Sequence, residues 1–179
     1  MKSSENPESV EMLLRQSAPL AVHHVGYAQE ERPNPLGHLS RIMKFGLVSP
    51  VGAEKIEKRL KKRIFLLTEE TRRQAAERPE LFSEVHGGAF HFSHAWNPNA
   101  AAEMLGRLHS YREMPAVVFR KPGFEGKSRL RVQPRFIIAA VLPELSSKET
   151  ERWIAELKKY KKPVYSHKGK RLWSPQEKG

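Results

Sequence analysis

The chain has 179 residues, and its 39% apolar and 29% charged residues are ordinary for a folded protein. It contains no cysteine, which excludes disulfides, thiolate metal sites and cysteine nucleophiles and fits a reducing compartment. Its net charge of +12 is unusual and favours a polyanionic partner such as a nucleic acid, an acidic protein or a phosphorylated ligand.

No apolar run approaches the length of a membrane span, so we expect no membrane association. The first seven residues, Met1–Pro7, lack the apolar stretch of a secretory signal. We therefore expect a cytoplasmic or otherwise intracellular protein, which could also be delivered to another cell.

The chain opens with a polar segment and continues into a short apolar strand. Residues 1–18 carry one apolar patch at helical spacing, and we predict a loosely attached N-terminal segment. Residues 19–28 read as a strand that carries His23 and His24. Successive strand residues point to opposite faces, so only one of these histidines can face a given cleft. An imidazole there can bind a ligand, although one half-buried and one surface histidine is the simpler interpretation.

A helix is predicted over residues 35–45. Asn34 suits its N-cap, Pro35 suits its first turn, and Gly46 suits a left-handed C-terminal end. The stretch that follows, 54–62, is strongly basic and has only two large apolar residues. It is predicted to be either a solvated helix or a mobile loop.

The middle of the chain is predicted to hold a buried strand followed by a helix. Residues 64–67 are all apolar, which is typical of a buried strand. Thr68 then suits the N-cap of a helix over 69–77, whose first-turn glutamates favour the helix dipole.

Three histidines lie in a stretch, 80–97, that has no clear periodicity. His86, His91 and His94 do not have the spacing of a zinc site, and no cysteine or paired carboxylate accompanies them. We predict no metal site, and we expect this stretch to serve packing or to cover a ligand.

The second half of the chain adds further strands and helices in mixed order. The patterns predict a helix over 98–111, a strand over 115–119, a half-exposed strand over 128–133, a buried strand over 136–142 and a helix over 149–161. This order is typical of a compact α+β fold with mixed or antiparallel sheets and flanking helices. We predict one α+β domain over 19–165, preceded by the segment 1–18 and followed by a basic tail over 166–179.

Two groups of basic residues are candidates for nucleic-acid binding. Arginines alternate along 128–133 and could bind phosphate, although such arginines also protect an edge strand. Lysines near the C-terminus are interleaved with aromatic residues and could hold a single strand by charge and stacking, although a charged helix end with a disordered tail has the same composition. The candidates are Arg129, Arg131, Lys158, Lys159, Lys161, Lys162, Lys170 and Arg171.

The order of motifs resembles the ADP-ribosyltransferase-like fold. The motifs are His24 on the first strand, a helix ending Phe45-Gly46-Leu47, the run Ile64–Thr68, and the strands Val117–Phe119 and Ile137–Pro143. The resemblance covers roughly residues 19–144, and its motifs are short. RNA 2′-phosphotransferases resemble the same fold and are also basic.

The resemblance implies that the chain binds NAD and transfers ADP-ribose to a nucleic acid or protein acceptor. In that family the first-strand histidine contacts the nicotinamide ribose. The implied NAD contacts are His24, Gly26, Thr68 and Phe82, and the implied catalytic residues are His24, Glu125 and Gln133.

The chain departs from the family pattern at three positions. Val25-Gly26 follows His24 where the family often has Gly-Thr, and Phe82 is the nearest aromatic where the family often has a tyrosine. Gln133 stands where a catalytic glutamate is expected, which leaves Glu125 as the nearest carboxylate. Three alternatives remain: a divergent transferase, an enzyme with arginine and histidine chemistry, or an inactive relative. We therefore carry two hypotheses, an NAD-dependent enzyme and a non-catalytic basic nucleic-acid-binding or assembly module.

Overall fold

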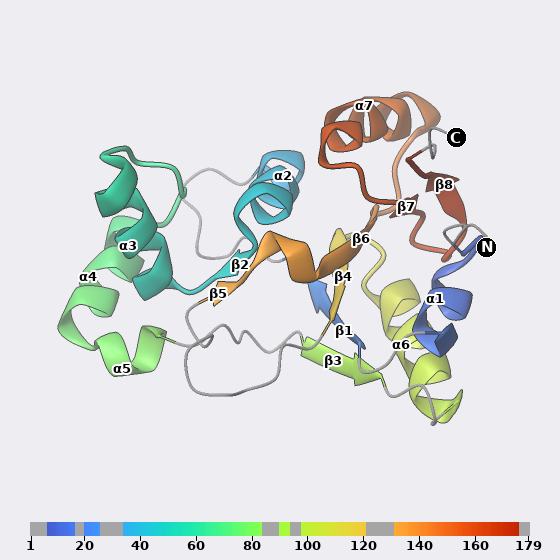
Figure 1. Cartoon of the computed structure of the whole chain (residues 1–179), viewed down its shortest axis with the longest axis horizontal. Helices are drawn as coiled ribbons and strands as arrows, with labels where there is room; N and C mark the ends of the chain where they lie inside the picture. The colour runs from blue at the N-terminus through green and yellow to red at the C-terminus, as the bar shows by residue number, and fades with distance from the viewer. Residues whose placement is uncertain are drawn as a thin grey trace. The chain divides into compact units, whose positions relative to one another are not determined.

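Helices and strands of an α+β fold make up the computed structural model, which describes residues 7–16, 20–25, 34–83, 90–93, 98–120 and 131–175 (Figure 1). The chain divides into two compact units. Unit 1 comprises Met1–Val25, Ala89–Lys121 and Ile138–Gly179, and unit 2 comprises Gly26–Gly88 and Pro122–Ile137. Within the described residues, no helix has the length and apolar character needed to cross a membrane.

A mixed sheet runs through unit 1 in the strand order β3-β1-β4-β6-β7-β8. Its strands are β1 (Leu20–His24), β3 (Phe90–Ser93), β4 (Ala116–Arg120), β6 (Ile137–Val141), β7 (Val164–Tyr165) and β8 (Arg171–Trp173). Strand β1 is antiparallel to both β3 and β4, β6 is parallel to β7, and β7 is antiparallel to β8. Strand β1 therefore lies inside the sheet. This position explains why four apolar residues and His24 are buried here: Leu20, Ala21, Val22, His24 and Val25.

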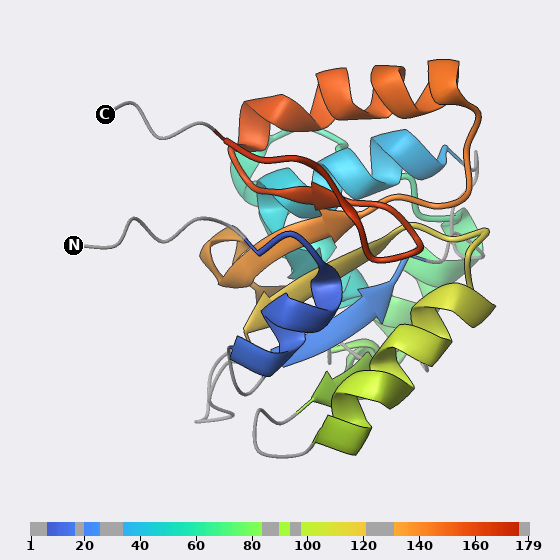
Figure 2. The ribbon, with the colours of Figure 1, turned by 90° about the vertical axis from the view of Figure 1, so that its right-hand side faces the viewer.

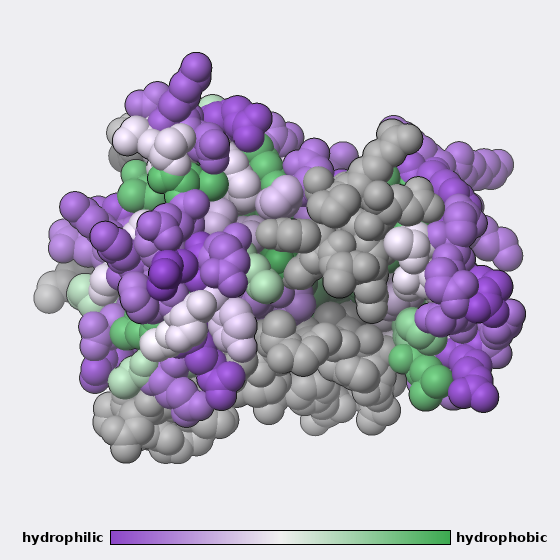
Figure 3. Space-filling model, turned by 180° about the vertical axis from the view of Figure 1, so that it is seen from behind, coloured by the Kyte–Doolittle hydropathy of each residue, from purple (hydrophilic) through white to green (hydrophobic). Residues whose placement is uncertain are grey.

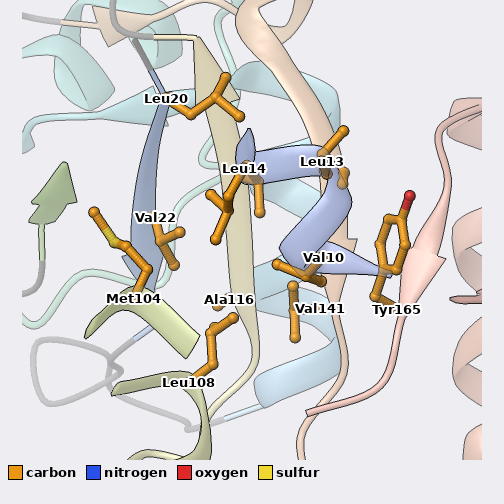
Figure 4. Close-up of a cluster of buried hydrophobic side chains, with 12 residues drawn as sticks. Val10, Leu13, Leu14, Leu20, Val22, Met104, Leu108, Ala116, Val141 and Tyr165 are labelled. Carbon is orange, nitrogen blue, oxygen red and sulfur yellow. The ribbon is translucent and has the colours of Figure 1, made fainter. Parts of the chain in front are cut away.

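The helices of unit 1 are α1 (Val10–Gln16), α6 (Pro98–Ser110) and α7 (Ser147–Leu157), which continues into the 3-10 turn η2 (Lys158–Tyr160). Helices α1 and α6 lie side by side against one face of the sheet (Figure 2). The core between them is apolar and draws on α1, α6 and four strands (Figure 4). Its members include Val10, Leu13, Leu14, Leu20, Val22, Met104, Leu108, Ala116, Val141 and Tyr165.

The N-terminal residues are held more firmly than the predicted loose segment. Val10 and Leu14 are fully buried, so α1 is part of the core. The Tyr165 hydroxyl donates a 2.7 Å hydrogen bond to the carbonyl oxygen of Pro7. Burial raises the pKa of Tyr165 to about 12, so this hydroxyl stays a donor at neutral pH.

Unit 2 contains the remaining helices and a short two-stranded sheet. Its elements are α2 (Pro35–Phe45), β2 (Leu47–Val48), α3 (Pro50–Leu60), α4 (Glu69–Glu77), α5 (Pro79–Phe82), β5 (Arg131–Val132) and the 3-10 turn η1 (Pro134–Phe136). Strands β2 and β5 are antiparallel, with Leu47 opposite Val132. The N-cap side chains Asn34, Ser49 and Thr68 accept backbone N–H bonds and begin α2, α3 and α4.

The predicted helices over 35–45 and 69–77 are confirmed, and the basic stretch 54–62 is largely helical. The predicted strand over 64–67 is wrong, because these residues form an irregular, half-buried connection between α3 and α4. The helix predicted over 149–161 ends earlier, at Leu157. The strand predicted over 128–133 can be compared only at β5, since 121–130 lie outside the described residues.

Gly46 has a structural role within the Phe45-Gly46-Leu47 motif. Its φ is +87°, a backbone conformation that L side chains rarely adopt. A Cβ atom at this position would lie 1.9 Å from the carbonyl oxygen of Val132. The glycine therefore lets β5 approach the end of α2, and this close approach accounts for the motif without any ligand.

Candidate functional site

His24, the central residue of the resemblance, is packed inside unit 1. Only 3% of its surface is exposed, and its ring centroid lies 5.0 Å from that of Tyr111, in a tilted arrangement. It shares a face of β1 with Leu20 and Val22, which belong to the apolar core. His23, on the opposite face, is half-buried. A ligand could reach the His24 imidazole only after the side chains around it moved.

Three further residues implied at the NAD site belong to unit 2. Thr68 caps α4, because its hydroxyl accepts a 3.1 Å hydrogen bond from the Thr71 N–H. Phe82 is the half-buried last residue of α5. Gln133 is exposed, and its main-chain carbonyl oxygen accepts a hydrogen bond from the Phe136 N–H in the turn η1. The Thr68 side chain thus has a local structural role, whereas only the main chain of Gln133 takes part in the turn η1.

Several predicted residues lie outside the described residues. They are Gly26, Glu125, Arg129, His86 and His94. Only the backbone of His91 is described, in β3. Among the described residues, no group of three or more histidines and carboxylates could hold a metal ion.

The C-terminal basic residues are divided between a turn and a hairpin. Lys158, Lys159 and Lys161 lie on or just after η2, and Lys159 forms an ion pair with Glu156. Lys162 is half-buried next to β7, and burial lowers its pKa.

Strand β8 places the remaining C-terminal candidates in the sheet. Lys170 precedes β8, and Arg171 lies opposite Tyr165 in the β7–β8 pair. The Arg171 N–H donates to the carbonyl oxygen of Glu8. Tyr165 is fully buried and cannot stack on a base. Of the aromatic residues interleaved with the basic ones over 158–173, Tyr165 is therefore unable to contribute stacking.

A denser group of cations lies at the end of α3 in unit 2. We call residues 58–63 the basic turn: Lys58, Arg59, Lys61, Lys62 and Arg63, with Leu60 among them. All five cations are exposed. Arg63 forms an exposed 2.7 Å ion pair with Glu69. Within the described part of the chain, no carboxylate forms an ion pair with any of the other four.

A buried ion pair holds the basic turn in place. The Arg72 guanidinium donates a 2.6 Å hydrogen bond to Glu57 Oε1 and a 2.7 Å hydrogen bond to the carbonyl oxygen of Phe65. Glu57 Oε2 accepts backbone N–H bonds from Ile64 at 2.7 Å and Phe65 at 3.1 Å. The side chains of Glu57 and Arg72 are only 8% and 10% exposed. The carboxylate therefore joins α3, the chain after the basic turn and α4.

The pKa of Glu57 reflects two opposing effects. Burial raises the pKa, and the hydrogen bonds from Arg72 and from the two backbone N–H groups lower it. The net result is a pKa below the usual value of a glutamate, so the carboxylate is ionised at neutral pH.

Lys61 occupies a strained backbone position. Its φ is +53° and it forms the left-handed C-cap of α3, where its N–H donates to the carbonyl oxygen of Glu57. Glycine and asparagine are the usual residues at such a position, because other side chains cost about 1 kcal/mol there. The cap places the Lys61 and Lys62 side chains beyond the last turn of α3.

An open depression lies beside the basic turn. It has a volume of about 460 Å³ and is lined by Glu54, Glu57, Lys58, Lys61, Lys62, Arg63 and Arg72. The region of α3 and α4, at the right edge of Figure 3, presents a mostly hydrophilic surface. Four of the seven lining residues are exposed cations, so the depression suits an anionic ligand.

Arg131 extends the positive region of unit 2. It is half-buried on β5, and its Nε donates a 2.6 Å hydrogen bond to the carbonyl oxygen of Phe45. Burial and the nearby charge of Arg59 lower the pKa of Arg131. Arg131 is thus held by the fold rather than extended into solvent.

The residues predicted from the sequence to bind nucleic acid do not include those of the basic turn. The sequence does contain a signal for this site, the run of five cations within 58–63. Such a run is equally typical of a solvated helix. The Glu57–Arg72 pair joins residues 15 positions apart, and no local pattern indicates it.

Comparison with protein-family models, curated proteins and solved structures finds no match for this chain.

Proposed function

We propose that this chain binds the phosphate backbone of a nucleic acid through the basic turn of unit 2. The observation that carries the proposal is the group of four exposed cations without an ion-pair partner in the described residues, on a turn held by a buried ion pair. Lysine and arginine side chains contact phosphates and release condensed counterions, which is the main source of sequence-independent affinity. The net charge of +12 attracts such a ligand at long range.

The backbone strain at Lys61 also supports this function. A glycine at this C-cap would relieve the left-handed conformation, so a lysine there lowers the stability of the fold. Residues held in unfavourable backbone conformations are concentrated at functional sites. The left-handed conformation of Lys61 therefore supports a function for its charge.

We expect the double substitution Lys61→Gln with Lys62→Gln to weaken binding of a fluorescein-labelled single-stranded oligonucleotide by about tenfold at low salt. The slope of log affinity against log salt should fall in magnitude by about 1.4, because two phosphate contacts to a single strand are lost. Fluorescence anisotropy over a series of salt concentrations measures both quantities.

The matched control is Lys148→Gln with Arg152→Gln, which removes the same charge from exposed positions of α7 in unit 1. Its affinity and salt slope should stay near those of the wild type. Equal losses in both double variants would mean that only total charge matters and would overturn the proposal. Lys61→Gly separates folding from binding, since it should raise the free energy of unfolding by about 1 kcal/mol and still weaken binding.

A second candidate function is transfer of ADP-ribose from NAD. The order of β1, α2 with Gly46-Leu47, β4 and β6 favours this ADP-ribosyltransferase-like proposal. The burial of His24 opposes it. Under this proposal His24 anchors the nicotinamide ribose, and millimolar NAD should raise the melting temperature of the wild type.

The packing of His24 leads to a different expectation. We expect His24→Ala to lower the free energy of unfolding by about 2 kcal/mol, because the substitution leaves a cavity beside Tyr111. His23→Ala on the same strand should cause a smaller loss, since His23 is half-buried. Denaturant unfolding of both variants, with and without NAD, tests the two roles together. Stabilisation by NAD that disappears in His24→Ala alone would favour the transferase.

A further inference from the structure

Two carboxylates line the depression beside the basic turn, and their surroundings differ. The Glu57 carboxylate is buried, and it accepts hydrogen bonds from Arg72 and from two backbone N–H groups. Glu54 lies one helical turn earlier on α3 and is half-buried. Within the described residues, the Glu54 carboxylate forms no hydrogen bond or ion pair with another side chain, even with Lys58 four positions later. Glu54 therefore has acceptor oxygens available at the wall of a cationic depression.

A carboxylate in this position constrains the chemistry of the ligand. It repels a phosphate, so a site for phosphate alone would bind more tightly without it. It accepts a hydrogen bond from a neutral donor such as a hydroxyl group, and such charge-assisted bonds are strong. The lining thus fits a ligand that carries an anionic group and a hydroxyl group close together.

We infer that the depression takes a ribonucleotide unit of an RNA strand, with Glu54 accepting a hydrogen bond from the ribose 2′-hydroxyl. The phosphate then lies against Lys58, Lys61 and Lys62, which line the same depression. This inference rests on the proposed nucleic-acid binding and specifies its ligand. A deoxyribose inside a DNA strand has no free hydroxyl, so RNA is bound more tightly than DNA of the same sequence.

The test compares three labelled single strands of one sequence, about 12 nucleotides long, made as RNA, DNA and 2′-O-methyl RNA. The full chain should bind the RNA about fivefold more tightly than either of the others, which corresponds to one hydrogen bond. The 2′-O-methyl strand keeps the ribose conformation close to that of RNA and removes only the donor.

The decisive variant is Glu54→Ala, in which alanine keeps the helical preference of α3. It should abolish the preference for RNA and leave DNA binding equal to or tighter than that of the wild type, because a repelling charge is removed. Glu151→Ala removes the same charge from an exposed position of α7 and should keep the fivefold preference.

The outcomes separate this inference from the proposed function. Equal binding of RNA and DNA by the wild type, or an equal loss for both in Glu54→Ala, would overturn the role of the 2′-hydroxyl while nucleic-acid binding stood. The second of these results would mean that Glu54 contacts a base. Absence of binding to all three strands would overturn the proposed function itself.

Discussion

We expect the Gly46→Ala substitution to lower the free energy of unfolding by about 3 kcal/mol or more. Alanine disfavours the φ of +87° at this position, and its Cβ would lie 1.9 Å from the carbonyl oxygen of Val132. That oxygen belongs to the backbone of β5, so relief requires β5 to move away from the end of α2. The pairing of Leu47 with Val132 would be disrupted as a consequence. Denaturant unfolding followed by circular dichroism measures the change.

Gly106→Ala is the matched control for this prediction. Gly106 lies within α6, and nothing is within 4 Å of the Cβ that alanine would add. This substitution should raise the free energy of unfolding by about 0.5 to 1 kcal/mol, through a better helical preference. If Gly46→Ala were as stable as the wild type, the close approach of β5 to Gly46 would be wrong.

The second large effect concerns the Glu57–Arg72 ion pair. Glu57→Gln should lower the free energy of unfolding by about 3 kcal/mol, because it leaves the Arg72 guanidinium buried without its counter-charge. It also weakens the acceptor of the Ile64 and Phe65 N–H groups. The double substitution Glu57→Leu with Arg72→Met should cost less than the sum of the two single changes, since no charge is then left alone. A fully additive double-mutant cycle would contradict the coupling.

The difference in stability between the wild type and Glu57→Gln depends on pH through the pKa of Glu57. Its pKa in the folded state is lower than in the unfolded state, so the stabilisation is complete above the unfolded pKa. It is lost as the pH falls through the folded pKa. The difference in stability between the wild type and Glu57→Gln should therefore be constant near neutral pH and shrink in acid, below about pH 4.5. A difference that stayed constant down to strong acid would place Glu57 outside the ion pair.

The local boundaries of the helices could be predicted from the sequence. Asn34, Ser49 and Thr68 each accept a hydrogen bond from an N–H group three residues later, so the information for these helix starts is contained in a few neighbouring positions. The bounds of α2 and α4 follow directly from such signals. The class of the fold, α+β, follows in the same way from the order of the patterns.

Contacts between distant residues decided what the local patterns left ambiguous. The apolar run 64–67 has the composition of a buried strand, yet the Glu57 carboxylate binds its first two N–H groups and holds an irregular connection. The N-terminal segment is polar in composition, but its Pro7 carbonyl meets the Tyr165 hydroxyl across 158 positions. Neither partner can be identified from periodicity, because each interaction depends on how the chain returns on itself.

The candidate site shows the same division between sequence and tertiary structure. Composition by itself determined that the chain is strongly cationic and has no cysteine chemistry, because charge and residue type do not depend on folding. The tertiary structure decided which residues can act. It buried His24 in a strand inside the sheet, and it held Lys61 and Lys62 at the surface through the buried Glu57–Arg72 pair. Accessibility and rigidity arise from packing, and packing joins residues that lie far apart in the chain.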